Sequence, residues 1–249
     1  MKKPIPLFFL VAVTAWAVTA TEQSKHIRQV VEIHRLRPQT GSAGHRVPQI
    51  DCLSWRLGVE TNNIRDWRLV PSECENYVGH YMLGEQYRDD CEVVADAAIE
   101  YANGLPSLTC LTMLAQTSLS GTAVPYNDTK FDEWVSEGKA PAIPASLRLY
   151  NTVLSLGIKP VFLTGTKEAF REVRIANLQE AGYYNWEKLV LKGVNDTGSA
   201  VEYKSGKRTE LVNAGYKIVG NIGDQWSDLL GVDVGDRTFK LPDPMYYIG

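Results

Sequence analysis

From residue 128 to the end of the chain, short apolar runs alternate with longer amphipathic segments. The runs IKPVFLT (158–164), KLVLK (188–192) and YKIVGNI (216–222) predict buried strands. A further edge strand is expected in RTFKLPDP (237–244). Helices are predicted at 144–157, 167–181 and 205–215. Because this alternation is typical of parallel β-α units, it predicts an α/β domain with function at the carboxyl ends of its strands.

The N-terminal part of the sequence is organised differently. Residues 1–20, MKKPIPLFFLVAVTAWAVTA, carry two lysines, an apolar stretch and then small residues. This pattern is typical of a secretory signal peptide cleaved after Ala20, and its apolar core is shorter than the roughly 20 residues of a membrane span. We expect a secreted or vacuolar protein, with an uncleaved anchor as the alternative. Residues 21–47 predict a flexible N-terminal arm, and 48–249 the remaining domain, with a helix at 84–104.

Such a compartment permits disulfides and glycans. The cysteines are Cys52, Cys74, Cys91 and Cys110. They allow three pairings if all are oxidised, and one disulfide with spare thiols is an equal alternative to two. The sequons at Asn127 and Asn195 are candidate glycosylation sites.

The charge balance excludes some partners. A formal net charge of -3 argues against nucleic acid, because phosphate binding requires a basic face. No basic amphipathic stretch supports a membrane partner. The length of 249 residues allows one sizeable core or two small ones.

Polar residues stand where the predicted strands end. Thr164 closes the first run, and Lys204 lies just ahead of a predicted helix. Asp224 closes the third run, and Asp228 follows one helical turn later. A hydroxyl and a lysine can bind an anion, and two carboxylates with water suit Mg²⁺. Each has a structural alternative: a turn threonine, a solvated lysine, and a helix cap made by Asp224.

In this order, the Thr, the Lys and GDxxxD resemble the motifs of the haloacid dehalogenase superfamily of phosphatases. Longer stretches resemble the plant acid phosphatase and vegetative storage protein family: YMLGEQYRDDCEVVADAAIEYANGL, FDEWVSEGKAPAIPASLRLYNTVLSLGIKPVFLTG and GYKIVGNIGDQWSDLLG. The resemblance covers residues 47–249 with one break. It implies a haloacid dehalogenase-type (Rossmann-like) parallel sheet flanked by helices, with an N-terminal helical extension. Thr166 stands where relatives have Arg, and we expect this loss to loosen the strand end or weaken substrate contact.

The resemblance also implies a chemistry. It is the Mg²⁺-dependent hydrolysis of small phosphate monoesters at acidic pH. Thr164 and Lys204 would contact the phosphate, and Asp224 and Asp228 would hold the metal. A homodimer is compatible with the family.

The break falls on the family's first motif, DxDxT. Its first Asp attacks phosphorus, and its second acts as general acid and base. Here no carboxylate occurs between Glu100 and Asp128. Matching TSLS (117–120) to the end of the motif puts Met113 at the nucleophile position and Ala115 at the acid–base position, and neither side chain can do this chemistry. Mg²⁺ binding is therefore also in question.

The altered segment has two interpretations. Residues 108–115 alternate in a way that suits a genuine replacement strand at the centre of the sheet. Alternatively, a shifted reading frame or a misjoined exon produced it, because the resemblance stops and resumes abruptly. We expect an acid phosphatase by lineage, impaired by loss of its nucleophile. The alternatives are a non-enzymatic vegetative storage glycoprotein and a chain that folds poorly because its central strand was rewritten.

Overall fold

The computed structural model describes residues 51–106, 111–115 and 128–248. These residues belong to one compact unit, Ile50–Gly249. The predicted signal peptide (1–20) and N-terminal arm (21–47) lie outside the described residues, as do Cys110 and Asn127.

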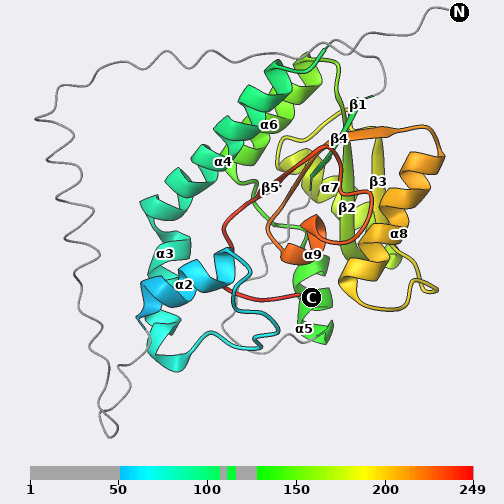
Figure 1. Cartoon of the computed structure of the whole chain (residues 1–249). Helices are drawn as coiled ribbons and strands as arrows, with labels where there is room; N and C mark the ends of the chain where they lie inside the picture. The colour runs from blue at the N-terminus through cyan, green and yellow to red at the C-terminus, as the bar shows by residue number, and fades with distance from the viewer. Residues whose placement is uncertain (1–50, 107–110, 116–127, 249) are drawn as a thin grey trace, which may run out of the picture. The chain divides into compact units, whose positions relative to one another are not determined.

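The described residues contain a parallel sheet with the strand order β3-β2-β1-β4-β5 (Figure 1). Every neighbouring pair of strands is parallel. The strands are β1 (Leu111–Ala115), β2 (Lys159–Lys167), β3 (Lys188–Lys192), β4 (Lys217–Gly223) and β5 (Arg237–Lys240). This arrangement confirms the predicted α/β class and the predicted edge strand.

Helices connect and cover these strands. They are α2 (Cys52–Glu60), η1 (Ser72–Cys74), α3 (Glu75–Leu83), α4 (Glu85–Asn103), α5 (Asp128–Glu137), α6 (Pro144–Ser155), η2 (Glu168–Phe170), α7 (Arg171–Glu180), α8 (Ala200–Asn213) and α9 (Trp226–Leu229). The helix expected at residue 205 begins at Ala200 instead, so that boundary was wrong. The physical reason is a capping box, in which Ser199 and Glu202 satisfy each other's backbone N–H groups.

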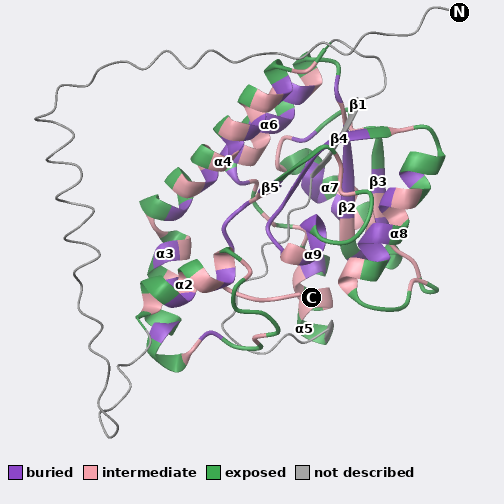
Figure 2. Ribbon diagram, viewed as in Figure 1, coloured by how far each residue is buried: buried purple, intermediate pink, exposed green. Residues whose placement is uncertain are grey.

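The core forms on both faces of the sheet because successive strand residues point to opposite sides. Val161 and Leu163 of β2 pack with Tyr203 and Leu211 of α8. Phe162, between them in sequence, packs with aromatic and aliphatic residues of α6 and α7. The apolar face of α4 packs with α6, β4 and β5. Figure 2 shows the resulting buried stretches along β2 and β4.

β1 occupies the centre of the sheet, between β2 and β4. Met113 pairs with Pro160 on one side and Gly220 on the other. Ala115 pairs with Phe162 and Ile222. The interpretation of this segment as a central strand is therefore confirmed for Leu111–Ala115.

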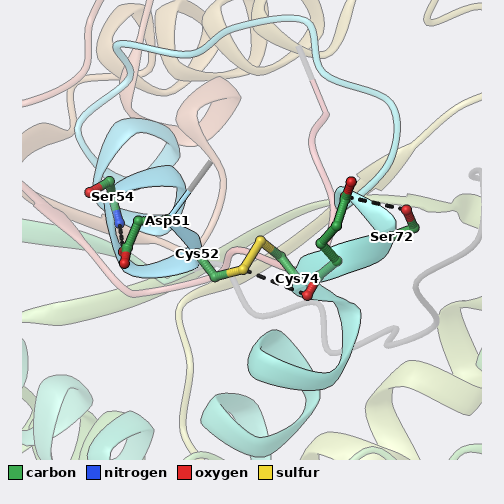
Figure 3. The surroundings of a disulfide bond; sticks show 6 residues. Asp51, Cys52, Ser54, Ser72 and Cys74 are labelled. Atoms are coloured by element: carbon green, nitrogen blue, oxygen red, sulfur yellow. Dashed lines mark hydrogen bonds between the residues drawn. A yellow bond between two sulfur atoms is a disulfide. The ribbon is translucent and has the colours of Figure 1, made fainter. Parts of the chain in front are cut away.

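A disulfide joins Cys52, the first residue of α2, to Cys74 at the end of η1 (Figure 3). Asp51 caps α2 by accepting a hydrogen bond from Ser54 N at 3.1 Å. Cys91 of α4 is free and fully buried. Of the pairings left open by sequence, the structure therefore selects Cys52 with Cys74.

None of the described helices is long and apolar enough to cross a membrane. Asn195 lies exposed in the turn that follows β3.

Candidate functional site

The carboxyl end of β4 leads directly into the candidate site. Asp224 follows the last strand residue, Gly223, and Gln225 begins α9 as its N-cap. A Cβ atom on Gly223 would lie 2.4 Å from the Cβ of Asp228, which is closer than real side-chain carbons approach. The glycine thus allows Asp228 to fold back onto the strand end that carries Asp224.

Asp228 is the most enclosed carboxylate of the site. Its side chain is 1% exposed and forms an ion pair with Lys204, which is 8% exposed. Lys204 Nζ also donates to Ser227 Oγ at 3.2 Å. The second oxygen of Asp228 accepts a hydrogen bond from Gln225 N at 3.0 Å. Both oxygens of Asp228 are therefore occupied, and Asp228 rather than Asp224 serves the helix cap.

Lys204 lies within the first turns of α8 and not ahead of the helix, because the helix begins earlier than predicted. Its placement still brings its ammonium group to the residues that follow β4. The prediction that Lys204 and the GDxxxD residues converge is confirmed for the Lys204–Asp228 pair.

Asp224 is buried and close to several charges. Burial, followed by the charge of Asp228, raises the pKa of Asp224 to about 6. Lys204, Lys240 and a hydrogen bond from Tyr246 act in the opposite direction. The Tyr246 hydroxyl donates to Asp224 Oδ2 at 2.9 Å. Within the described residues, this bond leaves the other carboxylate oxygen of Asp224 available.

Thr164 lies near the end of β2 and is half-buried. Its hydroxyl accepts a hydrogen bond from Thr166 N at 3.2 Å and lies 3.1 Å from the Thr166 hydroxyl. Its carbonyl accepts from the Tyr203 hydroxyl at 3.1 Å, which links it to the helix of Lys204. In the described chain Thr164 makes no direct hydrogen bond to Lys204, Asp224 or Asp228.

The expectation that Thr166 loosens the strand end or weakens substrate contact stays a prediction; the pairing of β2 with β3 shifts register between Leu163 and Lys167. Thr166 is 2% exposed, and β2 continues past it to Lys167, which pairs with Lys192 of β3. A small hydroxyl side chain fits this buried position and bonds locally to Thr164.

Sequence analysis missed the groups that hold this site together. The guanidinium of Arg208, which is fully buried, donates to the carbonyls of Asp228, Leu230 and Val232. Asn221 Nδ2 donates to the Asp228 carbonyl at 2.7 Å. Two signals were present: Arg208 follows Lys204 by one helical turn, and Asn221 is a polar residue inside an apolar run.

The C-terminal segment, also missed, closes the opposite side of the site. Gln225 Nε2 donates to Asp243 Oδ2 at 3.0 Å, and Gln225 Oε1 accepts from Ile248 N at 2.9 Å. Glu60 of α2 accepts from Asp243 N at 2.8 Å and pairs with Lys240 at 3.0 Å. Burial, with the nearby charge of Asp224, raises the pKa of Asp243 well above its usual value.

Comparison with known proteins identifies the family of the chain. The profile of the HAD superfamily, subfamily IIIB (Acid phosphatase), matches residues 39–249. The chain belongs to this acid phosphatase family. Its relatives include a stem 28 kDa glycoprotein of Glycine max, 42% identical over the full length of both chains. Acid phosphatase 1 of Solanum lycopersicum is 44% identical over 80% of this chain and 84% of its own. Vegetative storage protein 2 of Arabidopsis thaliana is 38% identical over 80% of each chain.

Acid phosphatases of this superfamily generally use a divalent metal, so the donor set of this member decides whether one fits. Mg²⁺ prefers octahedral oxygen coordination with carboxylate ligands. Lys204 and Gln225 N each contact one oxygen of Asp228, and Tyr246 donates to one oxygen of Asp224. No group of three or more His, Cys, Asp or Glu side chains in the described ranges is placed to hold a metal. These residues alone do not fit a complete Mg²⁺ site.

Proposed function

We propose that this member of the acid phosphatase family keeps the phosphate-binding side of the site but has lost most of its hydrolytic activity. The observation that carries this proposal is the composition of the central strand. β1 lies between the two strands that lead to Thr164 and Asp224, and it contains no carboxylate. None occurs anywhere between Glu100 and Asp128.

The pairing of β1 supports the loss of the nucleophile. Met113 pairs with Pro160 and Gly220, each four residues before Thr164 and Asp224. Ala115 pairs with Phe162 and Ile222, which lie two residues before Thr164 and Asp224, respectively. A thioether cannot form a stable phosphoenzyme, and a methyl group cannot carry a proton. Neither position supplies the family's nucleophile or its general acid and base.

No carboxylate of the C-terminal segment takes over this role. Asp243 is influenced by the charge of Asp224, but both of its oxygens are engaged. Oδ1 accepts from Met245 N at 3.0 Å, and Oδ2 accepts from Gln225 Nε2. Asp228 is held by Lys204. Neither carboxylate stands on β1, the strand that corresponds to the family's first motif.

Thr164, Lys204, Asp224 and Asp228 are the residues we assign to the retained part of the site. Thr164 and Lys204 would contact a small phosphate monoester, and Asp224 and Asp228 would be the protein ligands of Mg²⁺. Because these two carboxylates are the only ligands we assign, and Lys204 already pairs with Asp228, we expect Mg²⁺ to bind weakly. Millimolar Mg²⁺ should leave the thermal midpoint of unfolding unchanged, and a saturable increase would contradict this expectation.

The test is the turnover number on a chromogenic phosphate ester at acidic pH. Loss of a nucleophile typically removes several orders of magnitude of rate. The matched control is Asp224→Asn, which detects contaminating phosphatase. We expect the unsubstituted chain and Asp224→Asn to show the same background rate. A normal turnover that disappears in Asp224→Asn would overturn the proposal.

A second candidate function is that of a secreted or vacuolar storage glycoprotein. Two observations favour it: the similarity to a vegetative storage protein, and the exposed sequon at Asn195. Asn195→Gln should remove a glycan, seen as faster gel migration that endoglycosidase treatment reproduces in the parent. A storage role further requires abundance that rises with nitrogen supply. A scarce protein would not be a store.

A further inference from the structure

A small hollow lies outside the candidate site, between α7 and the segment that leads from α5 to α6. Two of its walls are apolar, formed by Ala142 and Leu178. Its polar walls come from Arg174 and Asn177 of α7 and from Tyr183, which follows that helix. The free space is enough for about one water-sized group.

The Nε–H of Arg174 is buried, and no carboxylate of the described residues pairs with this side chain. Arg174 is 7% exposed, and its Nε–H has no hydrogen-bond partner. Burial is the cause that lowers the pKa of Arg174, and no neighbouring charge opposes it. Since arginine remains protonated in proteins, Arg174 brings a positive charge to the lining of this hollow, and no carboxylate of the described residues neutralises it.

Tyr183 adds a second unused donor at the same hollow. Its side chain is 3% exposed, and its hydroxyl has no hydrogen-bond partner. The ring is held in place by edge-on packing against Tyr150 and Phe162, with centroid distances of 4.9 Å and 5.5 Å. This packing fixes the position of the hydroxyl oxygen.

The hollow is also formed in advance. Asn177 Nδ2 donates to the Ala140 carbonyl at 2.9 Å, which fixes the segment before α6 against α7. Buried polar groups are nearly always hydrogen-bonded, so two unpaired donors around one hollow indicate a missing acceptor. A water molecule could accept from both donors, but it would not neutralise the guanidinium.

We propose that this hollow is a binding site for one monoatomic anion of the halide class, held by Arg174 and Tyr183. A negative partner would neutralise the charge of Arg174, and the small free space favours a single atom over a tetrahedral oxyanion. The site is independent of the phosphate-binding side of the candidate active site, and the proposal does not depend on hydrolysis.

The test compares thermal unfolding of the full chain in sodium chloride and in sodium gluconate at equal ionic strength. Chloride should raise the Tm saturably, by roughly 5–10 °C at a hundredfold excess over Kd. Arg174→Met should abolish this response, and Tyr183→Phe should weaken it. Arg65→Met, which removes an equal charge from an exposed position, should keep it.

Equal Tm values in the two salts would overturn the proposal, as would an unchanged chloride response in Arg174→Met. A response to inorganic phosphate but not to chloride would also overturn it, because a larger anion would then be the ligand. If Arg174→Met does not fold, crystals grown with bromide decide the question. We expect an anomalous peak within hydrogen-bonding distance of Arg174 Nε and the Tyr183 hydroxyl, and its absence would reject the site.

Discussion

At the scale of single residues, the candidate site depends on a few close approaches that no larger side chain would allow. Gly223 is the clearest, because the side chain of Asp228 occupies the place of its missing Cβ. The ion pair of Lys204 with Asp228 exists only because the backbone of β4 and the start of α9 come this near.

Gly223→Ala should therefore lower the free energy of unfolding. Overpacking of this kind typically costs about 1–3 kcal/mol, since the strand or α9 must move. The control is Gly206→Ala on the exposed face of α8, where an added Cβ meets nothing within 4 Å. That change should raise stability by roughly 0.5–1 kcal/mol through helix propensity. Urea unfolding measures both, and equal effects would refute the steric argument.

At the scale of secondary-structure elements, Arg208 connects α8 to the segment after α9. Its Nε donates to Val232 O and its Nη1 to Asp228 O, each at 2.9 Å, and its Nη2 donates to Leu230 O at 2.6 Å. Burial lowers the pKa of Arg208, with the charges of Asp228 and Asp233 opposing that effect. Three carbonyls at the end of a short helix thus depend on one planar donor group.

Arg208→Lys tests this connection because it keeps the charge and removes the fork of donors. We expect a loss of about 2–4 kcal/mol in the free energy of unfolding, since an ammonium group cannot reach all three carbonyls. Arg88→Lys, at an exposed position of α4, is the matched control and should change little. If Arg208→Lys unfolds at the same urea concentration as the parent, the clamp contributes nothing to stability.

At the scale of the whole molecule, buried titratable groups make stability depend on alkaline pH. Burial raises the pKa of the Cys91 thiol from 9.0 to about 12, and that of the Tyr150 hydroxyl from 10.0 to about 12. The folded state thus holds these protons more tightly than the unfolded state. Their contribution is fully present below about pH 9 and is lost as pH rises toward 12.

Tyr150→Phe isolates one of these contributions. The variant should lose less stability than the parent between pH 10 and about pH 12, because one of the groups whose pKa burial raises is gone. At neutral pH it should lose roughly 1 kcal/mol with the hydrogen bond from Tyr150 to the Tyr184 carbonyl. Tyr184→Phe, with a half-exposed ring, is the control. The measurement is the urea midpoint of unfolding across this pH range. If the midpoints of Tyr150→Phe and the parent fall in parallel with pH, the contribution of Tyr150 is refuted.

Much of the architecture could be predicted from the sequence because its signals are local. The apolar runs ending at Thr164, Lys192 and Ile222 became β2, β3 and β4, and Gly104 followed the end of α4 as expected. Local patterns were less reliable at boundaries. The start of α8 at Ala200 depended on the Ser199–Glu202 capping box, which the apolar periodicity did not indicate.

The sequence by itself determined which chemistry-bearing residues the chain has and which it lacks. Asp224, Asp228, Lys204 and Thr164 stand at strand ends and near a helix start, and no carboxylate occurs between Glu100 and Asp128. Spacing along the chain is enough for such statements, because they concern only the identity and order of residues and the periodicity of each segment.

Only the tertiary structure decided the partners of those residues. Tyr246, Asp243 and Glu60 reach the site from the two ends of the described chain. Arg174 and Tyr183 line the same hollow, each with an unpaired buried polar atom. Contacts between residues far apart in the sequence depend on how the helices pack on the sheet. The same packing decides which buried charges have no partner. A local sequence pattern contains neither kind of information, because both arise only when distant segments come together.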